Sequence, residues 1–98
     1  MSGNVIYDKS YGFAIWIVKL YKYMAGEHKE YLLSKQVLRS GTAIGVLVRE
    51  VKFAQSRANF INKMSIALKE ANETSYWLDL LYDTNYKMKK CIKILTVT

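Results

Sequence analysis

The absence of proline is the feature that most restricts how this chain can fold. None of its 98 residues is a proline, and only five are glycines. Because proline and glycine are the residues that most often interrupt helices, long uninterrupted helices are expected. Strict alternation of polar and apolar residues, which would indicate a strand, is not sustained anywhere in the chain. The sequence therefore predicts an all-α protein.

The helix boundaries follow from the apolar periodicity and from a few capping residues. Four helices are predicted, over residues 10–25, 31–54, 58–83 and 87–95. Ser10 and Ser56 are predicted N-caps, because a short polar side chain at that position accepts a hydrogen bond from a free amide of the first turn. Gly26 is the predicted C-terminal stop of the first helix. There is no repeat, linker or low-complexity tract, so residues 1–98 are expected to form a single domain.

Charge and cysteine content limit the partners and the compartment. Fifteen Lys and Arg against eight Asp and Glu give a net charge of +7, which favours anionic partners. The single cysteine, Cys91, cannot form an internal disulfide, so a reducing compartment such as the cytoplasm is expected. The apolar stretch over residues 11–18 is shorter than the roughly 20 residues that span a bilayer, and no membrane association is predicted.

The predicted helices carry more apolar surface than one small core can hold. The core stripe of the second helix consists of Leu33, Val37, Ile44, Leu47, Val48 and Val51. The core stripe of the third helix consists of Phe60, Met64, Ala67, Ala71, Leu78 and Tyr82. Ile66, Trp77 and Leu80 form a second apolar stripe on the far side of the third helix, and the first helix is apolar around most of its circumference. Large exposed apolar patches mark interfaces, so self-association is predicted.

Two glycines in the second helix add to this prediction. Gly41 and Gly45 lie one turn apart, and a glycine inside a helix is about 1 kcal/mol less favourable than alanine. Close approach of a neighbouring helix would use the missing side chains, while a kink or break at the glycines is the alternative. The predicted oligomer interface comprises Gly41, Gly45, Ile66, Trp77 and Leu80.

Residues that could carry out catalysis or bind a metal are scarce. Di-metal carboxylate bundles need paired Glu-x-x-His motifs, and the chain has one histidine, His28. Residues 39–45 contain two glycines but lack the Gly-Lys-Ser/Thr ending of a phosphate-binding loop. We therefore predict no catalytic residue, no metal site, no cofactor, no small-molecule substrate and no enzymatic activity.

Residues 34–81 resemble the four-helix-bundle family of the 23S rRNA intervening sequence protein. The matching motifs are Ser40-Gly41 through Ile44-Gly45, Ala54-Gln55-Ser56-Arg57 with Phe60, Ala71-Asn72-Glu73-Thr74, and Tyr76-Trp77-Leu78. The resemblance implies an antiparallel up-and-down four-helix bundle that assembles into a homopentamer. Related accessory variability proteins of diversity-generating retroelements bind nucleic acid and a reverse transcriptase. The chain departs from the family pattern at Val46, Leu47 and Val48, and its fourth helix is expected to be short or truncated after Tyr86.

The leading functional prediction is a non-enzymatic, homo-oligomeric protein whose basic surface binds RNA or DNA. The predicted nucleic-acid contacts are Lys35, Arg39, Arg49, Lys52, Phe53, Arg57 and Lys63, with Phe53 stacking a base. The alternative is a structural or adaptor oligomer that binds a protein partner. In that case the cations would pair with Glu70, Glu73 and Asp79 of a neighbouring subunit.

Overall fold

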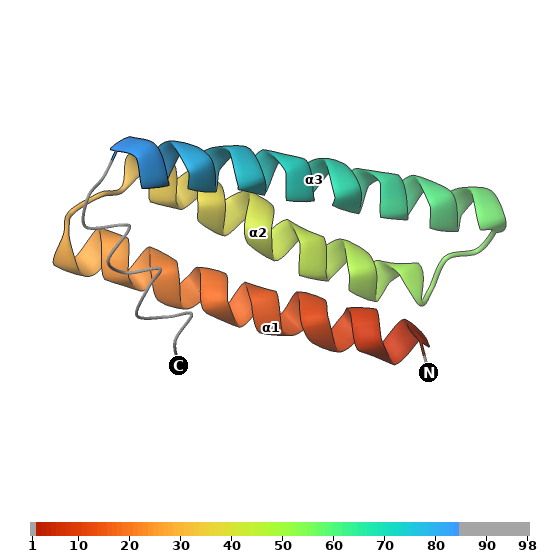
Figure 1. The fold of residues 1–98 in the computed structure, drawn as a ribbon. Coiled ribbons are helices and arrows are strands. Elements are labelled where there is room, and N and C mark those ends of the chain that lie inside the picture. Colours follow the sequence, from red (N-terminus) through yellow and green to blue (C-terminus); the bar gives the residue numbers. More distant parts are fainter. Residues whose placement is uncertain (1, 85–98) are drawn as a thin grey trace.

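The computed structural model describes residues 2–84 of the chain, and their side chains from residue 5 onward. Three α-helices follow one another, α1 (Ser2–Lys22), α2 (Leu32–Val51) and α3 (Arg57–Thr84), and a π-helical turn η1 (Tyr23–Glu27) extends α1. Successive helices run in opposite directions along the molecule, with α2 packed against both α1 and α3 (Figure 1). No strand occurs within residues 2–84, so the all-α prediction is confirmed for this part. The predicted fourth helix, residues 87–95, lies outside it.

The first helix begins eight residues earlier than predicted. It starts at Ser2, and Ser10 is an interior residue whose hydroxyl donates a hydrogen bond to the Tyr7 carbonyl at 2.9 Å. The prediction of Ser10 as an N-cap is therefore wrong. Serine satisfies its hydroxyl equally well on a carbonyl of the preceding turn, so a serine alone does not fix where a helix begins.

The turn between α1 and α2 is built by residues other than the predicted Gly26. No glycine in the described range has a positive φ, whereas Lys29 has φ 58°. The Glu30 amide then bonds back to the Met24 carbonyl at 2.9 Å and so closes the π-helical end of the helix. The Glu30 carboxylate accepts hydrogen bonds from the amides of Leu33 and Ser34, and so caps the start of α2.

The connection between α2 and α3 agrees with the sequence-based prediction. The Ser56 hydroxyl accepts a hydrogen bond from the Asn59 amide at 3.0 Å, which confirms Ser56 as the N-cap of α3. Before it, the amides of Lys52, Phe53 and Ala54 each bond to the carbonyl three residues back. These bonds tighten the last turn of α2 and leave the Phe53 side chain 82% exposed.

The core lies where the three helices face one another. Its buried cluster consists of Ile17, Leu20, Met24, Val37 and Leu81. Val37, Val48 and Ala67, all predicted core residues, are buried, but Phe60 and Tyr82 are more than two-fifths exposed. Their assignment to the core is wrong, because the buried positions of α3 fall seven residues apart, at Ala67, Thr74 and Leu81. That spacing places the seam of α3 at a slightly different angle from the predicted stripe.

A short polar chain crosses the buried interface between α2 and α3. Ser40 and Thr74 are 0% and 1% exposed, and the Thr74 hydroxyl donates to the Ser40 oxygen at 2.8 Å. The Ser40 hydroxyl in turn donates to the Gln36 carbonyl at 2.9 Å. Both hydroxyls therefore have partners, which removes the penalty of about 1–3 kcal/mol for an unsatisfied buried polar group.

None of the helices within residues 2–84 combines the length and the apolar character needed to cross a bilayer.

Candidate nucleic-acid interface

One end of the molecule gathers side chains from all three helices. The N-terminal part of α1, the last turn of α2 and the start of α3 meet at this end (Figure 1). The meeting follows from the antiparallel order, because α1 begins where α2 ends and α3 starts. Cations near residues 49–57 are thus brought beside aromatic residues near the N-terminus of the chain.

Arg49 is held against two tyrosine rings of α1. The central carbon of its guanidinium lies 4.8 Å from the centre of the Tyr7 ring and 5.2 Å from that of Tyr11. The Lys52 ammonium lies 5.4 Å from the centre of the same Tyr7 ring. Cations within about 6 Å of a ring centre are attracted to its negative face, by about 0.5–1 kcal/mol at exposed sites. Tyr7 and Tyr11 therefore position two cations without neutralising them.

Phe53 and Arg57 extend this surface into the connection between α2 and α3. Phe53 directly follows Lys52, and Arg57 is the exposed first residue of α3. Within the described part of the chain, no acidic side chain pairs with Arg49, Lys52 or Arg57. We call this set the basic aromatic cluster: Tyr7, Tyr11, Arg49, Lys52, Phe53 and Arg57.

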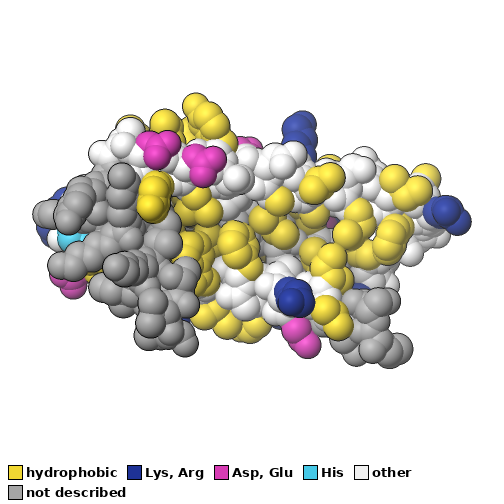
Figure 2. Space-filling view, in the orientation of Figure 1, with side chains coloured by type: hydrophobic (Ala, Val, Ile, Leu, Met, Phe, Trp, Pro, Cys, Tyr) yellow, Lys and Arg dark blue, Asp and Glu magenta, His cyan; other side chains and the backbone are white. Residues whose placement is uncertain are grey.

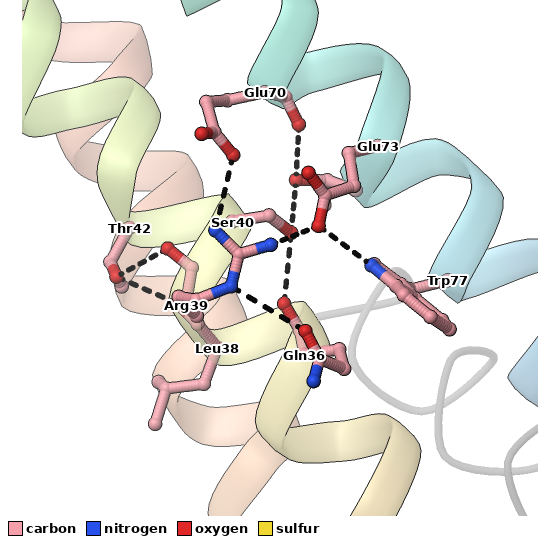
Figure 3. A network of polar contacts seen from close by, with 9 residues as sticks. Gln36, Leu38, Arg39, Ser40, Thr42, Glu70, Glu73 and Trp77 are labelled. Carbon is pink, nitrogen blue, oxygen red and sulfur yellow. Dashed lines mark hydrogen bonds and ion pairs between the residues drawn. The ribbon is translucent and has the colours of Figure 1, made fainter.

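Arg39, in contrast, is paired inside the chain. Its guanidinium bonds to the carboxylates of Glu70 and Glu73 on α3, and its Nε donates to the Gln36 side chain (Figure 3). The same Glu73 oxygen accepts the Trp77 indole N–H at 3.0 Å. Two of the three acids expected to meet cations of a neighbouring subunit, Glu70 and Glu73, thus bind a cation of their own chain. A phosphate would therefore have to compete with these two carboxylates for the Arg39 guanidinium.

The remaining predicted contacts do not join the cluster either. The Lys63 ammonium forms an ion pair with Glu50 at 2.9 Å. Lys35 is exposed near the start of α2, 14 residues before Arg49, which corresponds to about 21 Å along a helix. Of the seven predicted nucleic-acid residues, the structure brings two together, Arg49 and Lys52, over the Tyr7 ring. Phe53 and Arg57 are exposed and follow Lys52 in the chain by one and five residues.

Grooves open between α1 and each of the other two helices. The α1–α2 groove, of about 220 Å³, lies beside the basic aromatic cluster and is lined by Ser10, Tyr11, Ala14, Thr42, Gly45, Val46 and Arg49. The α1–α3 groove, of about 590 Å³, is mainly apolar and has α2 as its floor; its lining includes Ile6, Phe13, Ile44, Val48, Met64 and Leu68. Figure 2 shows hydrophobic side chains gathered between α1 and α3.

The residues predicted for an oligomer interface occupy different surroundings. Gly41 is buried inside the chain, where a Cβ would lie 2.9 Å from Ile17, so its close neighbour is α1 of the same chain rather than a second subunit. Gly45 lines the α1–α2 groove. Trp77 is half-buried and packs against the core cluster. Ile66 is exposed and Leu80 is half-buried, so the predicted second stripe of α3 is only partly accessible.

Residues 2–84 contain no group of three histidine, cysteine or acidic side chains close enough to hold a metal ion. The His28 ring lies against Tyr23, with 4.7 Å between ring centres. Its Nε2 is buried and has no hydrogen-bond partner within the described residues.

Sequence reasoning missed Tyr7 and Tyr11 as members of the cluster. Their signal is the four-residue spacing, which places two rings on one helix face. The spacing did not count as helical in the prediction, because the predicted first helix began at Ser10 and left Tyr7 outside it. Which cation the rings would meet depends on how α1 packs against α2.

The geometry defines an antiparallel helical protein with a cationic, aromatic surface at one end. The model of the 23S rRNA-intervening sequence protein family matches residues 3–97, so the chain belongs to that family, as the resemblance predicted. It is also similar to a crystal structure of a protein of unknown function from the S23 ribosomal protein family of Bacteroides thetaiotaomicron. The two share 54% identity with a TM-score of 0.86, over 98% of this chain and 89% of the other. No protein with a curated description matches the chain.

Proposed function

We propose that this chain is a non-enzymatic nucleic-acid-binding protein, and that the basic aromatic cluster contacts the ligand. The observation that carries the proposal is that Arg49 and Lys52 lie over tyrosine rings and that neither they nor the nearby Arg57 form an ion pair with a described residue. Unpaired cations bind phosphates, and aromatic side chains beside them stack on bases.

The charge distribution supports contacts at this end rather than along the whole of α2. Arg39 and Lys63 already have carboxylate partners at separations that allow ion pairs. A phosphate would have to displace those carboxylates, whereas it meets no competitor among the described residues at Arg49, Lys52 or Arg57. Affinity should therefore come from about three phosphate contacts per subunit and show little dependence on base sequence.

The experiment is a titration of the full chain into labelled single-stranded RNA or DNA of about 20 nucleotides, followed by fluorescence anisotropy. With three contacts, the logarithm of the association constant should fall by about 2 per tenfold increase in salt. Raising salt from about 50 mM to about 200 mM should thus weaken binding about twentyfold. Absence of binding at the lower salt, or binding that ignores salt, contradicts the proposed function.

We also propose that the protein is a homo-oligomer, with the pentamer implied by the family resemblance as the expected form. Several large apolar side chains lie exposed on the described chain outside both grooves, among them Tyr31, Leu32, Ile61 and Tyr76. Surfaces of this kind are usually covered by a partner. Light scattering should give a multiple of the 11.4 kDa chain mass, and a monomeric mass at micromolar concentration contradicts the proposal. The alternative is that a different protein, such as a reverse transcriptase, covers this surface.

A fourth helix over residues 87–95 is proposed to pack in the α1–α3 groove and complete a four-helix bundle. The groove follows α3 from Met64 to Asp79, about 22 Å, and α3 ends five residues beyond, at Thr84. Nine helical residues would fill about 14 Å of it. Slow alkylation of Cys91 in the folded protein, accelerated by Leu68→Glu in the groove, would support this arrangement. Equal rates in both proteins would exclude it.

We also propose that the protein is located in the cytoplasm, the compartment expected from its single cysteine.

A further inference from the structure

Two glycines of α2 differ in what their missing side chains make room for. A Cβ at Gly41 would meet three side-chain atoms of Ile17 at 2.9 to 3.2 Å, so packing inside the chain requires a glycine there. A Cβ at Gly45 would meet only the Ser10 carbonyl oxygen, at 3.7 Å, an ordinary contact. Glycine weakens a helix relative to alanine, and packing within the described chain does not explain why position 45 is a glycine.

Gly45 lies instead in the wall of the α1–α2 groove. The groove holds about 220 Å³, below the roughly 300–1,000 Å³ typical of pockets that enclose a whole small molecule. Its remaining walls are Val46 and the small side chains of Ser10, Ala14 and Thr42, with Tyr11 and Arg49 beside them. A larger side chain at position 45 would occupy this space. The groove is the size of a site for one flat ring of a larger ligand.

The groups beside the groove suit a ring that carries phosphates. The Tyr11 side chain is 53% exposed, so part of its ring is free to stack on another flat group. Arg49 lies against the Tyr7 and Tyr11 rings and forms no ion pair with a described residue, which leaves its N–H groups available to an anion. Lys52 follows one turn further along with its ammonium over the Tyr7 ring, and the exposed Phe53 is the next residue in the chain.

We propose that the α1–α2 groove receives one unstacked base of a single-stranded nucleic acid, and that Arg49 and Lys52 bind the phosphates on either side of that base. This inference rests on the proposed function and adds to it the class of ligand, single strands rather than duplexes. Tyr11 stacks on the base in the groove, and Phe53 stacks on its neighbour along the strand. Gly45 leaves open the space that the base fills.

A duplex satisfies the cations but not the groove. Bases in a duplex are paired and stacked, so a base enters a side pocket only after it is unpaired and swung out, which costs free energy. In a single strand the bases are free to leave the stack, and aromatic side chains accept any of them. The structure therefore predicts preference for single strands without preference for their sequence.

The test fills the groove without removing any charge. Gly45→Leu places a branched side chain in the groove, and Gly12→Leu is the matched control. A Cβ at Gly12, on α1, meets nothing within 4 Å, and Gly12 does not line the groove. The probes are single-stranded oligouridylate and oligothymidylate of about 20 nucleotides and a hairpin duplex of equal phosphate number. Anisotropy gives the affinities, circular dichroism the helical content and light scattering the oligomer mass.

We expect Gly45→Leu to weaken single-strand binding about tenfold or more, the loss of one stacked base, while Gly12→Leu leaves it unchanged. The wild type should bind the duplex more weakly than it binds the single strands. Both variants should bind the duplex as tightly as the wild type does. If Gly45→Leu leaves single-strand affinity intact, or if duplex binds as tightly, the groove inference is wrong while salt-dependent binding still supports the proposed function. A changed oligomer mass for Gly45→Leu makes the groove a subunit interface and overturns the inference. Absence of binding by the wild type overturns both proposals.

Discussion

Replacing Arg49, Lys52 and Arg57 together with glutamate should weaken binding to single-stranded nucleic acid at least a hundredfold. At about 0.1 M salt each phosphate contact contributes a factor of about five through counterion release, so three contacts contribute about a hundred. The introduced carboxylates add repulsion to this loss. The dependence of affinity on salt should flatten at the same time, and the loss should be equal for unrelated sequences. Anisotropy titrations at several salt concentrations measure both quantities.

A charge-matched variant separates a local site from the overall positive charge. Lys19, Lys22 and Lys35 are exposed cations toward the opposite end of the helices, and none forms an ion pair with a described residue. Their replacement with glutamate changes the net charge by the same amount. This control should lose only a few-fold in affinity. Equal losses in the two triple variants would refute a localised site, and loss of the oligomer in the first variant would identify its cations as interface residues.

The parts of the fold that depend on local sequence were predicted well. The second and third helices were placed within three residues at each end, and Ser56 caps α3 as expected. Val37 and Val48 are buried as their helical spacing indicated. These features follow from periodicity and from hydrogen bonds between near neighbours, which a sequence records directly.

The errors concern features that the sequence does not record locally. Ser10 has the residue type of an N-cap but bonds to the Tyr7 carbonyl within the helix. Gly26 was expected to provide the reversal of the chain, which Lys29 provides with its positive φ. In both cases a residue type that permits a boundary does not require one. Where the chain turns is also decided by how Met24 and its neighbours pack in the core.

The composition of the candidate site depended on contacts between helices. Arg39 and Arg49 look alike in the sequence, as basic residues on the outer side of the same helix. Arg39 faces Glu70 and Glu73 of α3, whereas Arg49 faces Tyr7 and Tyr11 of α1. The same holds for Gly41 and Gly45, one against Ile17 and the other in a groove. In each pair, the difference between the two residues depends on how the helices pack together, which the sequence does not show.

Gly41→Ala should destabilise the protein, although alanine favours a helix by about 1 kcal/mol over glycine. The new Cβ would lie 2.9 Å from Cγ1, 3.1 Å from Cγ2 and 3.2 Å from Cδ1 of Ile17. Ile17 is 0% exposed and branched at Cβ, so its side chain has little freedom to move away. Overpacking in a rigid surrounding is unfavourable by about 1–3 kcal/mol, and we expect it to exceed the helix gain. Gly45→Ala, with open space beside it, should stabilise by up to about 1 kcal/mol.

Removing the Ile17 side chain should reverse the sign of the Gly41 effect. Ile17→Ala deletes all three atoms that the new Cβ would contact, and by itself lowers the free energy of unfolding by about 2–5 kcal/mol. In that background the Cβ added by Gly41→Ala no longer overlaps the Ile17 side chain and fills part of the cavity, so the substitution should raise the free energy of unfolding. Urea unfolding of the two single variants and the double variant, all carrying Gly45→Ala to offset part of the loss, measures the coupling. An equal effect of Gly41→Ala with and without the Ile17 side chain would show that α1 does not restrict position 41.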